Sequence, residues 1–135
     1  MKTERRVANR KPVDTVEVSE LTSLEHYRVL ARTGHIRDAS TSGFLMMINR
    51  KDLVPKELRE NLTLQELIGQ QVVMYLPLMN LDLDGRITRA EHKGRGWFEI
   101  GVQFSNDVPL YWRECLIEML PNPGELEPEE EQAAE

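Results

Sequence analysis

The chain has 135 residues, of which 40% are apolar and 30% are charged, and its formal net charge is −6. A chain of this length can build one ordinary hydrophobic core but not two full domains. No apolar run approaches the roughly 18 residues that are needed to cross a bilayer. The composition therefore predicts one globular domain and excludes a transmembrane helix or membrane insertion.

The N-terminal end of the chain is basic. Residues 1–11 hold five bases against the single acid Glu4, and no apolar stretch follows them as it would in a secretory signal. The single cysteine, Cys115, cannot form an internal disulfide, which agrees with a reducing compartment. We therefore expect a cytoplasmic protein in which residues 1–12 form a mobile segment that suits an anionic ligand.

Six segments have the composition of β-strands, because they are rich in β-branched and other apolar residues and are separated by turn residues. They are residues 13–18, 27–36, 44–48, 72–78, 85–90 and 97–104. Asp84-Gly85 and Gly94-Arg95-Gly96 are typical of the turns between strands. Short strands at this spacing predict a mainly β protein built as a small six-stranded antiparallel barrel.

Two helical regions are predicted. Pro55, and then the capping-box pair Thr63 and Glu66, indicate a short helical insertion over residues 55–68. After a cap at Asp107 and Pro109 in the first turn, apolar residues recur at helical spacing and end before Pro121. These residues are Tyr111, Trp112, Cys115, Leu116, Met119 and Leu120. We expect a C-terminal amphipathic helix that covers one face or end of the barrel.

The last residues of the chain differ in composition from the rest. Residues 121–135 contain three prolines, six acids and no bases, so they account for the whole net charge. Such a segment lacks the apolar surface that offsets the entropy of ordering. We expect a disordered acidic tail after a folded domain that spans residues 13–120.

Arginines precede the first predicted strand. Arg6 and Arg10 are four residues apart, and Arg5 comes directly before them. A guanidinium group binds phosphate or the O6/N7 edge of guanine through two hydrogen bonds and stacks on a purine face. These residues can hold a nucleotide, although by themselves they are more typical of a solvated basic terminus.

A cluster of short polar residues separates the second and third predicted strands. Residues 37–43 read Arg-Asp-Ala-Ser-Thr-Ser-Gly, in which Asp38 and Ser40 can bond the backbone and Gly43 permits a close approach or a positive φ. Alone, the cluster is also typical of an ordinary well-formed turn.

Taken together, the two features resemble the two-part signature of the PilZ domain family. Arg6-x-x-x-Arg10 is followed at a distance by Asp38-x-Ser40-x-x-Gly43, and the later segment Gly-Val-x-Phe at residues 101–104 is similar to the family's last strand. The resemblance implies a six-stranded antiparallel barrel of the split-barrel type with a C-terminal helix. It also implies that cyclic di-GMP binds on the outer surface of the barrel.

The resemblance further implies a role for each motif residue. Arg6 and Arg10 would grip phosphate and the Hoogsteen edges of guanine. The positions of Asp38, Ser40 and Gly43 would form the barrel side of the pocket. Arg5 occupies the position that influences whether one ligand or an intercalated pair is held, and an arginine there favours the pair.

We therefore expect a receptor for cyclic di-GMP that is not an enzyme and that changes conformation to signal to a protein target not identified by the sequence. A monomer or weak dimer is expected, without nucleic acid as a partner. The alternative is a PilZ-like protein adaptor that does not bind the nucleotide. A small barrel that binds single-stranded nucleic acid is disfavoured, because the body of the chain is neutral and its tail is acidic.

Two other sequence patterns do not predict a metal site. Residues 80–91 fit the ligand spacing of an EF-hand loop, but their flanks are typical of strands rather than helices. The three histidines are scattered and there is one cysteine, so we expect no metal. Trp97 and Trp112 fall on strand and helix patterns, which favours places in the core or at the barrel ends.

Overall fold

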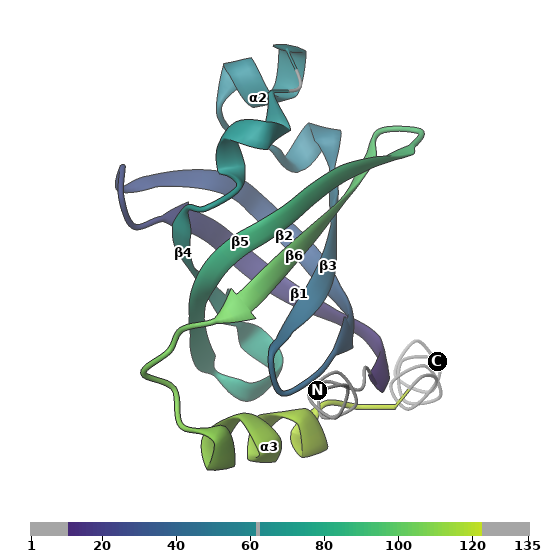
Figure 1. The fold of residues 1–135 in the computed structure, drawn as a ribbon. Helices are drawn as coiled ribbons and strands as arrows, with labels where there is room; N and C mark the ends of the chain where they lie inside the picture. Colours follow the sequence, from purple (N-terminus) through teal and green to yellow (C-terminus); the bar gives the residue numbers. More distant parts are fainter. Residues whose placement is uncertain (1–10, 62, 123–135) are drawn as a thin grey trace, which may run out of the picture.

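Six antiparallel strands close into a barrel in the computed structural model, which describes residues 11–61 and 63–122 (Figure 1). The strands are β1 (Lys11–Ser23), β2 (Arg28–Ala39), β3 (Gly43–Asn49), β4 (Gln71–Leu76), β5 (Leu81–Gly94) and β6 (Trp97–Phe104). Their order around the barrel is β1-β2-β3-β6-β5-β4, and β4 closes the ring by pairing with β1. The predicted six-stranded antiparallel barrel is confirmed.

Side chains that alternate along the strands fill the barrel. In β6, Phe98, Ile100, Val102 and Phe104 are buried at every second position, as expected for a strand with one face in the core. Burial of each large apolar side chain contributes about 1.5 to 3 kcal/mol relative to exposure. The other face of each strand is thereby left to form the outer surface of the barrel.

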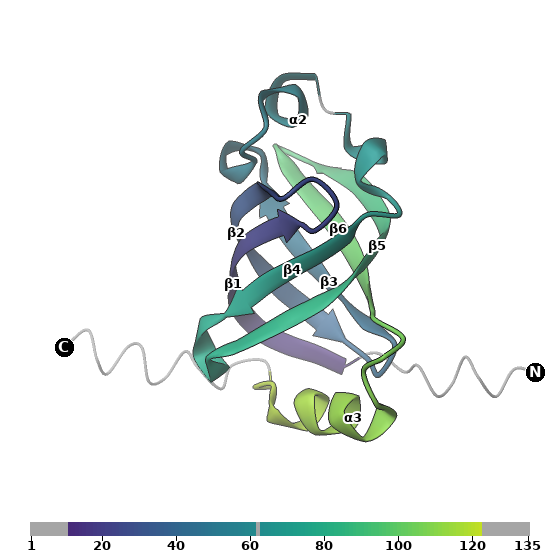
Figure 2. The ribbon, with the colours of Figure 1, turned by 90° about the vertical axis from the view of Figure 1, so that its left-hand side faces the viewer.

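Helical segments close the two ends of the barrel. At one end lie η1 (Arg50–Asp52), α2 (Lys56–Asn61) and η2 (Leu64–Leu67), which confirms the predicted helical insertion. Leu53, Leu58, Leu64 and Leu67 of this region are buried. The C-terminal helix α3 (Leu110–Met119) lies across the opposite end, as Figures 1 and 2 show. Leu116 of α3 and Leu120 after it are buried.

The turn predicted at Asp84-Gly85 is wrong. Both residues lie inside β5, where they pair with Val73 and Val72 of β4. The chain instead reverses at η3 (Pro77–Met79) and Asn80, whose φ is 53°. Gly85 serves a close approach between strands, because an added Cβ would lie 2.3 Å from the carbonyl oxygen of Gln103. The predicted turn at residues 94–96 is confirmed, since it joins β5 to β6.

The bounds of the terminal elements also differ from the predictions. β1 begins at Lys11 and is longer than predicted. α3 begins at Leu110, and its cap residue is Pro109 rather than Asp107. Tyr111 and Met119 of the predicted apolar stripe are 75% and 59% exposed. Of the predicted mobile segment (residues 1–12) and disordered tail (residues 121–135), residues 1–10 and 123–135 lie outside the described residues, whereas Lys11 and Pro12 belong to β1.

Gly43 occupies a position that no side chain can enter. A Cβ built there would lie 2.0 Å from the carbonyl oxygen of Val102 in β6. We predict that Gly43→Ala lowers the free energy of unfolding by about 2 kcal/mol or more, because β3 and β6 would have to separate. Chemical denaturation measures this loss.

Gly101→Ala is the matched control for Gly43→Ala. The three atoms nearest to its added Cβ would all be side-chain atoms, the closest being the Cβ of Arg89 at 3.1 Å. We expect this variant to stay within about 1 kcal/mol of the parent. Equal stability of the two variants would contradict the close approach at Gly43.

Candidate functional site

The hairpin between β2 and β3 carries three of the predicted site residues. Asp38 lies near the end of β2, and Ser40 and Gly43 flank the two-residue tip formed by Thr41 and Ser42. The backbone N–H of Ser40 donates to Gly43 O at 2.7 Å, and that of Gly43 donates to Ser40 O at 3.3 Å. The buried Ser40 hydroxyl accepts from the backbone N–H of Ser42 at 3.2 Å. Ser40 and Gly43 thus shape the hairpin itself.

Strand pairing places Asp38 where the polypeptide enters the barrel. Asp38 is half-buried and pairs with Pro12 of β1. Pro12 follows Arg10 by two residues in the sequence, so the segment with the predicted arginines joins the barrel beside Asp38. The predicted site residues Arg5, Arg6 and Arg10 themselves lie outside the described residues.

A groove lies on the outer face of the barrel, over β2, β3 and the β5–β6 hairpin. It consists of two depressions, with volumes of about 460 and 560 Å³, that share Arg37, Met47 and Lys93. The first is also lined by His35, Gly94, Arg95 and Trp97, and the second by Pro12, Asp38 and Glu99. We call the two depressions together the outer groove. Its volume lies in the range that binds small organic ligands.

Cations are in excess over anions along the outer groove. Arg37, Lys93 and Arg95 oppose two carboxylates, those of Asp38 and Glu99. Arg37 lies at an irregularity of the β2–β3 pairing, where the register shifts between Ile36 and Asp38. None of the three cations was among the predicted site residues. A pocket with this charge favours an anionic ligand.

Trp97 forms an aromatic wall at the hairpin end of the outer groove. It is 38% exposed, so it is not a core residue; as the first residue of β6, opposite Asn49, it lies at one end of the barrel, in agreement with the second of its predicted places. Strand alternation could have located it, because Phe98 and Ile100 are the apolar positions that point inward and their neighbours must point outward. An exposed indole beside arginines is suited to stack on a planar base.

The segment that resembles an EF-hand loop forms part of the barrel. Residues 80–91 run from the end of η3 into β5, and β4 comes before them in place of a helix. Among residues 11–61 and 63–122, no group of three or more His, Cys, Asp or Glu side chains is arranged to hold a metal ion. Within the same residues, no helix is long and apolar enough to span a membrane.

Two cationic side chains tie α3 to the segments that border the outer groove. Arg113 donates from Nη1 to Thr41 O at 2.7 Å and from Nε to Val108 O at 3.1 Å. Lys11 donates from Nζ to Ile117 O and to Leu120 O, both at 3.1 Å. Cations at the C-terminal carbonyls of a helix satisfy acceptors that the helix leaves open. The helix is thereby linked to the tip of the β2–β3 hairpin and to the start of β1.

The fold is similar to that of MrkH from K. pneumonia, which was solved in its apo state. The match has a TM-score of 0.51 and 15% sequence identity, and it covers 96% of this chain and 53% of the MrkH chain. This chain therefore spans about half the length of that neighbour. At this identity the likeness concerns the fold alone. No protein-family model matches the sequence, and no curated protein matches it either.

Arg113 provides a test of the link between α3 and the β2–β3 hairpin. We predict that Arg113→Ala speeds hydrogen exchange of the α3 amides about tenfold, because the loss of a charged hydrogen bond of about 1.5 kcal/mol favours local opening. The amides of β3 and β6 should keep their protection. Exchange followed by mass spectrometry measures both regions.

Arg86→Ala serves as the control for Arg113→Ala, since Arg86 is an exposed arginine of β5. It should leave the exchange of α3 unchanged. Parental exchange of α3 in the Arg113 variant would show that this side chain does not hold the helix.

Proposed function

We propose that the chain is a cyclic di-GMP receptor that binds the nucleotide in the outer groove and passes the signal to a protein partner. The observation that carries the proposal is the pairing of Asp38 with Pro12. This pairing brings the hairpin half of the PilZ-like motif to the point where the arginine half joins the barrel. Asp38 and Pro12 both line the outer groove, whose two depressions together hold three cations and two carboxylates.

The chemistry of the outer groove matches that of the proposed ligand. Cyclic di-GMP carries two phosphate groups and two planar guanines. Arg37, Lys93 and Arg95 can donate charged hydrogen bonds to phosphate, and Trp97 offers a face for a base. We assign Arg6 and Arg10 to phosphate and guanine edges, and Asp38 to the barrel side of the pocket. Arg5 favours an intercalated pair of ligands.

The proposal is for a receptor without catalytic activity that acts in the cytoplasm. The structural similarity of the chain to MrkH supports a fold shared with that protein and is compatible with a regulatory role. α3 is the proposed output, because it contacts the tip of the β2–β3 hairpin through Arg113 and the start of β1 through Lys11. A ligand held between these two segments would change the surface that α3 presents to a partner.

One observation favours a second candidate, a protein adaptor that does not bind nucleotide. Ser40 and Gly43 each have a structural role, in the hairpin hydrogen bonds and in the close approach to β6. Their presence is therefore explained without a ligand. The excess of cations along the outer groove favours an anionic ligand, and for this reason the receptor is the first proposal.

Calorimetric titration with cyclic di-GMP tests the receptor proposal. We predict saturable binding by the full chain, and a loss of affinity of about tenfold or more in Arg6→Ala, since a charged hydrogen bond contributes about 1.5 to 3 kcal/mol. GTP is the control ligand and should not compete. Two ligands per chain would support the intercalated pair. Absence of heat and of a thermal shift in the parent would leave the adaptor.

Trp97 gives a test that depends on the groove rather than on the motif. We predict that Trp97→Ala weakens cyclic di-GMP binding at least fivefold, because stacking of a base on an aromatic side chain contributes about 1 to 3 kcal/mol. Tyr75→Ala is the matched control, since Tyr75 is also 38% exposed but lies on β4 away from the groove. Equal affinity of the two variants would place the ligand elsewhere.

A further inference from the structure

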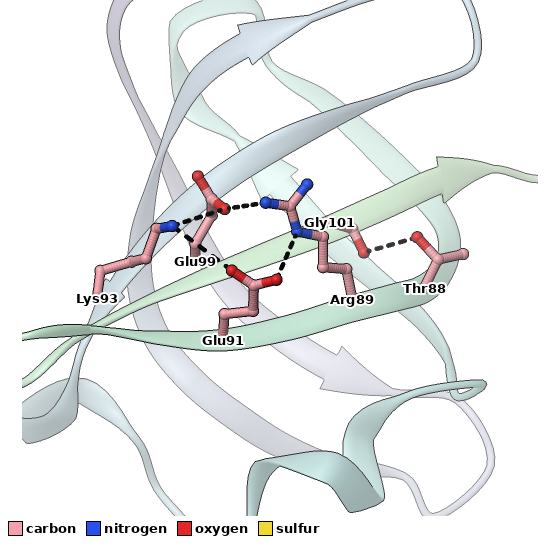
Figure 3. Close-up of polar contacts among 6 residues, drawn as sticks. All are labelled: Thr88, Arg89, Glu91, Lys93, Glu99 and Gly101. Atoms are coloured by element: carbon pink, nitrogen blue, oxygen red, sulfur yellow. Dashed lines mark hydrogen bonds and ion pairs between the residues drawn. The ribbon is translucent and has the colours of Figure 1, made fainter.

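Four charged side chains form a closed ring on the outer face of β5 and β6, which we call the charge ring. Arg89 contacts Glu99 at 2.8 Å and Glu91 at 3.4 Å, and Lys93 contacts Glu91 at 3.5 Å and Glu99 at 3.8 Å. Figure 3 shows each cation joined to both carboxylates. The four formal charges sum to zero.

Strand pairing explains why the charge ring needs two cations. Glu91 and Glu99 are directly opposite each other in the β5–β6 ladder, and like charges in such a pair repel. Arg89 and Lys93 stand two residues before and after Glu91, on the same face of β5. Of the two carboxylates, Glu99 depends more on a neighbouring cation, because only 16% of its side chain is exposed and water screens its charge less than that of Glu91.

The two cations of the charge ring differ in how they are held and in what they line. The Arg89–Glu99 contact has the length of a charged hydrogen bond, whereas both contacts of Lys93 are longer. Lys93 lines both depressions of the outer groove, and Glu99 lines one of them. Arg89 lines neither. An anion in the groove can therefore take Lys93 from the ring while Arg89 stays on Glu99.

We propose that Arg89 is a positioning residue for an anionic ligand of the outer groove, although it does not touch that ligand. It neutralises and holds the Glu99 carboxylate when Lys93 turns from the charge ring to a ligand phosphate. Without the Arg89 side chain, the Glu99 carboxylate keeps its ion pair with Lys93 and repels the ligand phosphate. This inference rests on the proposed function for the identity of the ligand, and on the charge ring for the role of Arg89.

A double-mutant cycle tests the positioning role. The full chain, Arg89→Ala, Glu99→Gln and the double variant are titrated calorimetrically with cyclic di-GMP, and separately with pyrophosphate, at constant ionic strength. We expect Arg89→Ala to weaken binding about three- to tenfold, and Glu99→Gln to strengthen it. The double variant should return to within about twofold of Glu99→Gln alone, because no carboxylate is left to neutralise.

Controls separate positioning from structural damage and from net charge. Arg86→Ala removes the same charge from the same strand and should leave the affinity for both anions near that of the parent. If Arg89 only stabilises the β5–β6 hairpin, the double variant will bind as weakly as Arg89→Ala or more weakly. That result, or parental affinity in Arg89→Ala, would overturn the positioning role.

The two ligands distinguish failure of this inference from failure of the proposed function. Binding of cyclic di-GMP by the parent, with no effect of Arg89→Ala, would keep the function and overturn the role of Arg89. Binding of pyrophosphate alone, with the expected cycle, would keep the role of Arg89 and overturn the function. Binding of neither anion by the parent would overturn both.

Discussion

The close approach of β6 to both of its neighbours is the constraint on which the rest of the structure depends. A Cβ on Gly43 of β3 would lie 2.0 Å from Val102 O, and a Cβ on Gly85 of β5 would lie 2.3 Å from Gln103 O. The two glycines therefore flank the same part of β6. A slip of one residue would bring a side chain into this space and would also turn every outward residue of β6 into the core. The glycines and the alternating pattern thus select one register.

This register assembles the outer groove from distant parts of the chain. In one row of the sheet, His35 pairs with Met47 and Met47 pairs with Glu99, which itself faces Glu91. Side chains from β2, β3, β5 and β6 meet in this row on the outer face. Lys93, from the end of β5, contacts the row through Glu99 and Glu91. The arrangement of the cations and carboxylates in the groove therefore depends on the pairing of strands that are distant in the sequence rather than on any local motif.

The sequence predicted the elements whose signal is local. Alternating apolar residues identified the strands, and Pro55 with Thr63 and Glu66 identified the helical insertion. The predicted capping box is wrong, however, because the Thr63 side chain makes no cap hydrogen bond at the start of η2. Asp84-Gly85 misled because its residues are typical of a hairpin turn, whereas the structure uses Gly85 for a close approach inside β5. Turn propensity cannot show which atoms another strand will bring near a glycine.

The candidate site could be predicted only in part, for the same reason. The resemblance identified Asp38, Ser40 and Gly43, and the structure brings these residues together in one hairpin. Lys93, Arg95 and Trp97 come from a hairpin far along the chain, and only the pairing of β3 with β6 brings them beside β2. Helical spacing likewise overestimated the buried face of α3, because the barrel end covers Leu116 and Leu120 but not Tyr111 or Met119.

Arg113 and Lys11 tether α3 to the barrel through hydrogen bonds. The free energy of these bonds determines whether a ligand can move the helix, and so whether the helix can serve as the output of a receptor. A ligand shifts a conformation only through contacts that differ between the two states, and a complete reversal of a 1:99 population needs about 5.5 kcal/mol. The tethers of Arg113 and Lys11 are charged hydrogen bonds, each worth about 1.5 to 3 kcal/mol. Arg113 makes one such bond to the hairpin and Lys11 makes two to α3, so the three bonds together are of the size required. A ligand that disturbed either tether alone would loosen α3, whereas one that engaged both the β2–β3 hairpin and the start of β1 could release it. The proposed signal therefore requires both halves of the motif to bind at once, and a nucleotide with two phosphates and two bases has the groups to do so.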